Sequence, residues 1–247
     1  MNNETPQHEY ALLEQMASAS GTDKGARIHN YTGVYYRYFG PIRHKALKFL
    51  EIGLFKGSSV KMWEHYFPNA ELHFVDITGE YLEYRSSRSK YHFLDQSNMT
   101  QLREFIAENG GPFDIIIDDG GHMPNQIITS FQALFPFLSA NGGIYVVEDL
   151  HSAYWYGFGG TGVLASSGKN NSNDVPLLNV TTSAHETPGS AIHFLKNLLD
   201  EVNFVGANTA YGSASFVTPE LRQNMTEYAQ HIESMHFYNS LCFIMKK

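Results

Sequence analysis

The sequence predicts an α/β fold in which a mostly parallel sheet carries helices on both faces. Short apolar runs alternate with helical patterns along most of the chain, as in repeated βα units. Two of the runs, Phe113–Ile117 and Ile144–Val147, are apolar at consecutive positions apart from Asp114, which is typical of strands covered on both faces. Each run leads directly into acidic residues, so we expect polar side chains where these buried strands end.

The individual elements follow from apolar periodicity and from breaker residues. A leading helix is expected over His8–Ser18, where apolar residues recur at helical spacing. A second helix is expected to be capped by Ser58. The expected strands are Ala46–Ile52, Leu72–Ile77, Tyr91–Leu94, Phe113–Asp119, Ile144–Glu148, His231–Tyr238 and Leu241–Met245, and the remaining helices are Met99–Ala107, Asn125–Phe137 and Ser190–Val202.

The last two strands form a hairpin at Asn239-Ser240, which would place one antiparallel strand in the sheet. Residues 156–188 are rich in Gly, Ser and Asn without a period, and we interpret them as a lid over the substrate, with disorder as the alternative. Nothing marks a second domain, so the sequence predicts a single domain over 1–247. Its parts are an N-terminal helix and clamp segment (1–45), the binding core (46–155), the lid (156–188) and a C-terminal helix and hairpin (189–247).

Composition excludes several classes of partner. The chain has 247 residues, of which 43% are hydrophobic, and can bury one large core. With 17 basic and 25 acidic residues the formal charge is −8, which argues against nucleic acid. The single cysteine, Cys242, cannot form an internal disulfide, so a cytoplasmic location is expected. No stretch reaches the roughly 18 apolar residues of a membrane span, and no leader pattern is visible.

A glycine-rich turn, Glu51-Ile52-Gly53-Leu54-Phe55-Lys56-Gly57, follows the first expected strand. Such a turn lets the backbone approach a ligand at a helix N-terminus, although it can also serve tight packing alone. Asp76 ends the next strand, where a nucleoside site needs a carboxylate for the ribose hydroxyls. Because the acidic Glu51 would repel a pyrophosphate, a cationic nucleoside without phosphate is favoured.

Several motifs together resemble class I S-adenosylmethionine-dependent methyltransferases, and within them the metal-dependent sugar O-methyltransferases of macrolide and rhamnosyl tailoring. The resemblance implies a Rossmann-like fold with seven strands, one of them antiparallel, and S-adenosyl-L-methionine and Mg²⁺ or another divalent cation as cofactors. It also implies metal ligation by Asp119, Glu148 and Asp149, with His122 as the catalytic base. Gly121 stands where many relatives have serine. The motifs are Gly21–Gly25, His29–Tyr31, Leu50–Gly53, Ile117–His122, Glu148–His151 and Ser234–Ser240.

Physical chemistry agrees with this assignment. A neutral alcohol is a poor nucleophile, and a hard cation with oxygen ligands would make a bound hydroxyl more acidic. Acids at buried strand ends repel one another unless a cation neutralises them. The alternative is that Glu148 and Asp149 cap the next turn or pair with Lys or Arg. A neutral His122 suits a general base, with substrate orientation as its alternative role.

The other candidate residues divide into cofactor and acceptor contacts. Asp95 and Gln96 are expected to bind adenine, with Asn98 capping the next helix, and Asp118 is expected to face the methionine moiety. Residues 22–24 are expected to contact the cofactor carboxylate or the substrate. An aromatic group at Tyr35, Tyr36, Tyr38 and Phe39 fits either an acceptor wall or a packing face. Further cofactor candidates are Glu51, Gly53, Ser58 and Asp76, and acceptor candidates are His151, Tyr154, Trp155, His29 and Tyr31.

The expected function is therefore Mg²⁺-assisted O-methylation, from S-adenosylmethionine, of a sugar hydroxyl on a glycoside or natural product. Methylation of a catechol-like or other small-molecule hydroxyl is one alternative. A non-catalytic S-adenosylmethionine-binding protein is another, although the complete set of Asp119, His122, Glu148 and Asp149 argues against it. The expected partner is a small hydroxylated molecule, and the resemblance and the apolar N-terminal helix favour a homo-oligomer.

Overall fold

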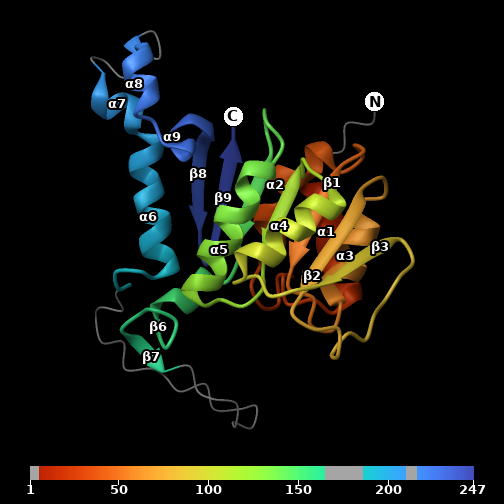
Figure 1. The fold of residues 1–247 in the computed structure, drawn as a ribbon. Helices are drawn as coiled ribbons and strands as arrows, with labels where there is room; N and C mark the ends of the chain where they lie inside the picture. Colours follow the sequence, from red (N-terminus) through yellow and green to blue (C-terminus); the bar gives the residue numbers. More distant parts are fainter. Residues whose placement is uncertain (1–5, 165–185, 210–215) are drawn as a thin grey trace.

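A computed structural model describes residues 6–164, 186–209 and 216–247 of the chain (Figure 1). Its centre is a seven-stranded sheet with the order β3-β2-β1-β4-β5-β9-β8. β9 lies antiparallel to both of its neighbours, β5 and β8, and the other pairings are parallel, which confirms the expected sheet and its one antiparallel strand. The strands are β1 (Lys48–Ile52), β2 (Glu71–Asp76), β3 (Ser89–Phe93), β4 (Ile115–Asp118), β5 (Ile144–Val147), β8 (Ile232–Tyr238) and β9 (Leu241–Lys246).

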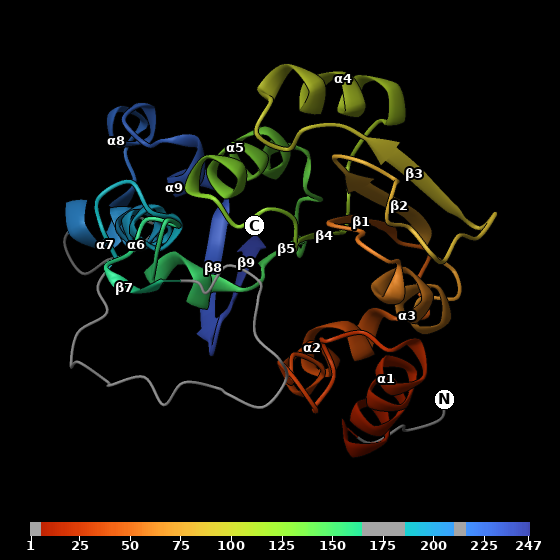
Figure 2. The same ribbon diagram turned by 90° about the horizontal axis from the view of Figure 1, so that it is seen from below.

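Helices cover both faces of the sheet, as Figure 2 shows, with α4, α5 and α6 on one side and α1, α2 and α3 on the other. In β4, Ile116 packs into the core under the first group, whereas Ile115 and Ile117 pack into the core under the second. Because both faces are covered, the three positions before the terminal Asp118 are all apolar. The helices are α1 (Pro6–Ser20), α2 (Thr32–Phe39), α3 (Ser58–Tyr66), α4 (Met99–Asn109), α5 (Pro124–Leu134) and α6 (Ala191–Val202).

The register of the sheet brings three polypeptide segments to one edge. Ile52 of β1 pairs with Asp118 of β4, and Asp118 pairs with Val147 of β5. The residues that follow, Gly53, Asp119 and Glu148, therefore leave the sheet side by side. The chain order reverses between β1 and β4, and in open α/β sheets such a switch point forms the ligand crevice.

Some local predictions need correction. Ser58 does not cap α3: the N-cap is Gly57, at a left-handed φ of 85°, and Ser58 is the first helical residue. Helix α2 was not expected, because Gly33 and its tyrosines are weak helix formers, and its stability comes from burial of Tyr35 and Phe39. Short helices α7 (Phe204–Asn208), α8 (Pro219–Gln223) and α9 (Glu227–His231), and the two-stranded pair β6 (Trp155–Tyr156) and β7 (Gly162–Leu164), were also unpredicted.

Two expectations concern regions beyond the sheet. Most of the lid expected over residues 156–188 lies outside the described residues, which leave out 165–185. Within the described ranges, we find no helix that combines the length and the apolar character needed to cross a membrane.

Candidate active site

A cavity of about 480 Å³ opens at the carboxyl ends of β1, β2 and β4, which is the size range of small-molecule sites. Five of the expected cofactor residues line it: Gly53, Ser58, Asp76, Asp95 and Gln96. Thr22 and Asp23 of the N-terminal segment close one side, and Asp119 forms part of the wall. The cavity therefore joins the expected cofactor residues to the expected metal site.

The glycine turn is fixed by close packing against the loop after β4. Gly53 has a φ of 101°, and a Cβ there would lie 2.0 Å from the Asp119 carbonyl oxygen, so only glycine fits. Asp76 Oδ2 accepts hydrogen bonds from the backbone N–H groups of Leu54 (2.7 Å) and Phe55 (3.1 Å). These bonds lock the turn to the end of β2 and hold the Asp76 carboxylate at the cavity wall.

Asp118 supports the cavity wall from behind. It is buried and outside the cavity lining, and its Oδ1 accepts a hydrogen bond from Gln96 Nε2 at 3.0 Å. Gln96 Oε1 in turn accepts one from the N–H of Gly121 at 2.7 Å. Burial raises the pKa of Asp118 to about 6. The expected cofactor contact of Asp118 is therefore corrected to a supporting role, and the Gln96 amide orients the loop before His122.

Glu51 was also expected to contact the cofactor, and the structure places it elsewhere. Its side chain is fully buried, lies outside the cavity lining and accepts hydrogen bonds from Ser59 Oγ (2.7 Å) and Trp63 Nε1 (3.1 Å). Burial raises the pKa of Glu51 to about 7, although the charge of Lys24 opposes this shift. Glu51 is therefore part of a buried charge cluster beneath the cavity.

Lys24 is the centre of that cluster. Its ammonium donates hydrogen bonds to Asp119 and to Glu148 Oε2 (2.8 Å), and it lies 3.5 Å from Glu51 Oε1. Residues 22–24 were expected to contact the cofactor carboxylate or the substrate. Lys24 is only 1% exposed and reaches neither of them. The alternative expected for Glu148 was an ion pair with Lys or Arg in place of metal ligation. The structure contains such a pair, between Glu148 and Lys24.

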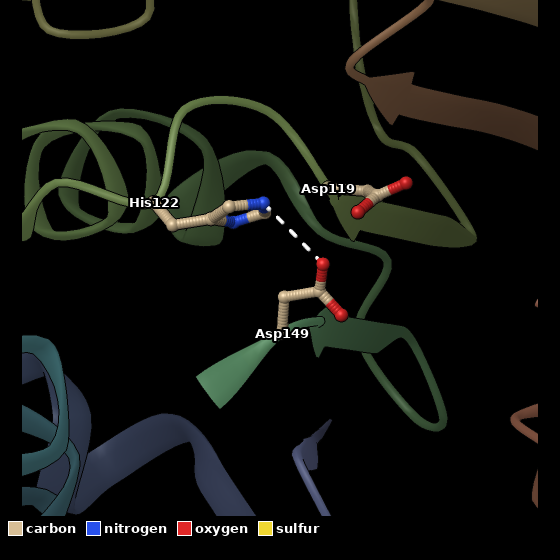
Figure 3. Close-up of side chains that lie close together, drawn as sticks. All are labelled: Asp119, His122 and Asp149. Carbon is tan, nitrogen blue, oxygen red and sulfur yellow. Dashed lines mark ion pairs between the residues drawn. The ribbon is translucent and has the colours of Figure 1, made fainter. Parts of the chain in front are cut away.

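Among the described residues, two groups of side chains could each hold a cation, and they share Asp119. The outer group is Asp119, His122 and Asp149, whose ligand atoms lie within 4.8 Å of one another. Figure 3 shows the two carboxylates and the imidazole converging, with His122 Nε2 3.5 Å from Asp149 Oδ2. The inner group joins Asp119 to the buried Glu51 and Glu148 and surrounds Lys24. Of the three expected metal ligands, Asp149 belongs to the outer group, Glu148 to the inner group, and Asp119 to both.

The charges of this site favour an additional cation. Burial and the charge of Asp119 raise the pKa of Glu148, and burial raises the pKa of Asp119, although Lys24 lowers both. Burial also acts to raise the pKa of Asp149, but a hydrogen bond from Tyr31 and the nearby His122 bring it below the usual value. One ammonium thus faces three acids, Glu51, Asp119 and Glu148, with Asp149 next to Asp119. The hard oxygen donors of these carboxylates are those that Mg²⁺ prefers. The residues present fit the expected divalent cation.

Two tyrosine hydroxyls fix the acids of the 148–149 turn. Tyr31 donates a hydrogen bond to Asp149 Oδ1, and Tyr35 donates one to Glu148 Oε1, both at 2.5 Å. Both tyrosines are buried, which corrects the expectation that Tyr31 contacts the acceptor. Tyr35 combines hydrogen bonding with ring packing, a combination that the sequence did not indicate. The i,i+4 spacing of Tyr31 and Tyr35 is the signal that could have linked them.

Partly exposed rings form a wall beside Asp149. His29 stacks on His151 with ring centroids 5.9 Å apart, and His151 meets the edge of Trp155 at 4.9 Å. His151 Nδ1 lies 3.0 Å from Ser240 Oγ, and burial lowers the pKa of His151 below its usual value. Tyr154 is half-buried and packs instead against the core beneath α5 and α6. The wall therefore places three expected acceptor residues, His29, His151 and Trp155, near the outer group.

Comparisons with known proteins find similar proteins both by sequence and by structure. No family model matches the chain. It is 32% identical over 227 residues to L-olivosyl-oleandolide 3-O-methyltransferase of Streptomyces antibioticus, covering 89% of this chain and 52% of the relative. It is 31% identical over 242 residues to 8-demethyl-8-alpha-L-rhamnosyl tetracenomycin-C 2'-O-methyltransferase of Streptomyces olivaceus, covering 95% and 54%.

A solved structure, the MycE methyltransferase of the mycinamycin biosynthetic pathway in complex with Mg, SAH and mycinamycin VI, superimposes with a TM-score of 0.72. It is 29% identical to the chain, with 95% of this chain and 53% of that chain covered. The chain therefore spans about half the length of the relatives that it matches.

Proposed function

Because the chain is a relative of the sugar O-methyltransferases of macrolide and tetracenomycin pathways and has the class I methyltransferase fold, we propose that it methylates a sugar hydroxyl of a glycoside. The methyl donor is S-adenosyl-L-methionine, bound in the cavity at Gly53, Ser58, Asp76, Asp95 and Gln96. The observation that carries the proposal is the position of Asp119. It lines this cavity and also belongs to the outer group with His122 and Asp149, so donor and acceptor sites meet there.

The reaction requires a nucleophilic oxygen beside the sulfonium methyl group. The acceptor oxygen forms a bond to the methyl carbon, the carbon–sulfur bond breaks, and the sulfur keeps the electron pair. The hydroxyl proton goes to His122, whose imidazole has 25% side-chain exposure and faces the outer group. An imidazole at this point suits a general base.

The carboxylates of Asp119, Glu148 and Asp149 would hold the divalent cation, with Mg²⁺ as the proposed ion. When bound, such an ion orients substrate oxygens and makes a bound hydroxyl more acidic. The wall of His29, His151 and Trp155 would receive the acceptor, because apolar ring faces stack on sugar rings while the imidazole nitrogens can bond to hydroxyls. Tyr154 stays a proposed acceptor contact at the end of the neighbouring 150–154 segment. MycE was solved with a glycoside, mycinamycin VI, which supports this acceptor class.

The proposal also covers the cellular location, the domain organisation and the oligomeric state of the enzyme. It includes a cytoplasmic location, a single domain over 1–247 and a homo-oligomer. The family resemblance supports self-association, whereas the apolar face of α1, with Leu13 and Ala17, packs inside the chain.

Methylation assays with added Mg²⁺ test the proposal. We expect transfer from S-adenosylmethionine to at least one member of a panel of rhamnosylated and deoxyglycosylated natural products, and we expect excess EDTA to stop it. Product formation is measured by mass spectrometry. Methylation of catechols alone would favour the catechol-type alternative, and an unchanged rate in EDTA would contradict the metal. Cofactor binding without turnover on any acceptor would favour a non-catalytic binding protein.

Removal of the proposed base should affect turnover more than binding. His122→Ala is expected to lower kcat about 100- to 10,000-fold, the usual contribution of general acid–base catalysis. SAH affinity should stay the same, because His122 lies outside the cavity lining. Steady-state kinetics and calorimetric SAH titration measure the two quantities. His65→Ala, which changes an exposed histidine on α3, is the control. Turnover near that of the unmodified chain would remove His122 from the base role.

A further inference from the structure

One N-terminal segment, from Lys24 to Phe39, supplies a hydrogen-bond donor to every proposed metal-binding carboxylate. Lys24 Nζ donates to Asp119 and Glu148, the Tyr35 hydroxyl donates to the other oxygen of Glu148, and the Tyr31 hydroxyl donates to Asp149. From the sequence, residues 22–24 and 29–31 were expected to contact cofactor or acceptor, and the aromatic group at 35–39 to form either an acceptor wall or a packing face. The side-chain donors of this segment instead bond to the carboxylates of Asp119, Glu148 and Asp149.

The three donors reach the acids from the protein interior. Their exposures are 1% for Lys24, 2% for Tyr31 and 0% for Tyr35, and none of the three belongs to the cavity lining. Asp119 and Asp149, by contrast, retain side-chain exposures of 22% and 19%. The donors therefore leave the outer side of these carboxylates open to a cation and lie where they cannot touch cofactor or acceptor.

Packing fixes the tyrosines independently of any ligand. The Tyr35 ring stacks on Phe39 at 4.9 Å and meets Trp63 edge-on at 5.4 Å. Tyr31 lies one helical turn earlier, and its ring contacts Tyr35 at 6.4 Å. Since these rings are part of the core between α2, α3 and the sheet, their hydroxyls hold Asp149 and Glu148 at set positions and orientations.

We propose that this segment forms the outer shell of the metal site, with Lys24, Tyr31 and Tyr35 as positioning residues that set its affinity for a divalent cation. The inference rests on the proposed function, since it requires a metal on Asp119, Glu148 and Asp149. Groups that orient metal ligands through hydrogen bonds typically contribute about 10- to 100-fold to metal affinity. Loss of either hydroxyl removes a hydrogen bond that orients Asp149 or Glu148, although Lys24 still bonds to Glu148 Oε2.

The test is a titration of each purified full-length variant with Mn²⁺, followed by electron paramagnetic resonance of the free ion. Tyr31→Phe and Tyr35→Phe are each expected to raise the Kd for Mn²⁺ about 10- to 100-fold. Tyr38→Phe is the matched control, because Tyr38 lies on the same helix but bonds to His236 and Tyr238, away from the acids. Its Kd should equal that of the unmodified chain. SAH affinity should be the same in all four proteins, since none of these tyrosines lines the cavity.

Metal binding should also act on the segment in return, because coupling between two sites is reciprocal. Hydrogen exchange of peptides from residues 24–39 is expected to slow when Mn²⁺ is added to the unmodified chain, and to slow less in Tyr35→Phe. Equal Mn²⁺ affinity in all variants would overturn the inference and leave the proposed function intact. An equal loss of affinity in Tyr38→Phe would also overturn it, by showing a general effect of α2. Failure of the unmodified chain to bind Mn²⁺ would overturn the metal part of the proposed function itself.

Discussion

Replacement of Asp119 by asparagine is expected to lower methyl transfer on the order of a thousandfold, because a catalytic cation contributes several kcal/mol to the transition state. Asp119 is the residue common to the inner and outer groups, so its loss weakens the hold on the cation more than the loss of either neighbour. Asparagine keeps the shape of the side chain and removes only the charge. Turnover at saturating Mg²⁺ and acceptor measures the effect.

Cofactor binding separates this effect from a general loss of the site. Asp119 forms only one part of the cavity wall, so SAH affinity measured by calorimetry should change by only a few fold. Asp200→Asn makes the same change of charge on the exposed side of α6 and should leave turnover unaltered. If Asp119→Asn retained most of its turnover, neither metal ligation nor the shared role of this carboxylate would survive.

Replacement of Lys24 by methionine is expected to lower the free energy of unfolding by about 3–5 kcal/mol, the usual cost of leaving buried charges without their partner. The methionine fills a similar volume but leaves Glu51, Asp119 and Glu148 facing one another without the ammonium. Urea unfolding in EDTA at pH 7 measures the loss without a contribution from metal.

An exposed lysine provides the comparison for that experiment. Lys45→Met removes a charge from the surface and should change the free energy of unfolding by less than about 0.5 kcal/mol, as surface substitutions usually do. A similarly small loss in Lys24→Met would show that the acids need no ammonium to remain buried.

The sheet could be predicted because its signals are local. The consecutive apolar residues of Ile115–Ile117 identify a strand covered on both faces, and the structure places them in two separate cores. The position of Asp119 and Glu148 at one edge then follows from the pairing of parallel strands. Gly53 and Asp76 could be assigned for the same reason, since each lies at a strand end.

The partners of Lys24 and Asp118 could not be read from local patterns. Lys24 meets Asp119 across 95 positions and Glu148 across 124, and no spacing in the sequence indicates such a contact. Asp118 and Asp119 are adjacent and chemically alike, but the alternation of a strand sends Asp118 toward Gln96 and Ser130 and Asp119 toward Lys24. The tyrosines of α2 were ambiguous because a phenol can pack with its ring and donate with its hydroxyl at once.

The long span between Lys24 and its acids has a consequence for folding on the ribosome. The lysine is synthesised early, yet its last partner, Glu148, follows 124 positions later, after β1 to β5 have been made. Domains form as units when the required chain has emerged, and distant pairings come late because loop closure must precede them. The paired acids therefore come together only in chains whose sheet is complete as far as β5, so a nascent chain released before that point carries no assembled cation site.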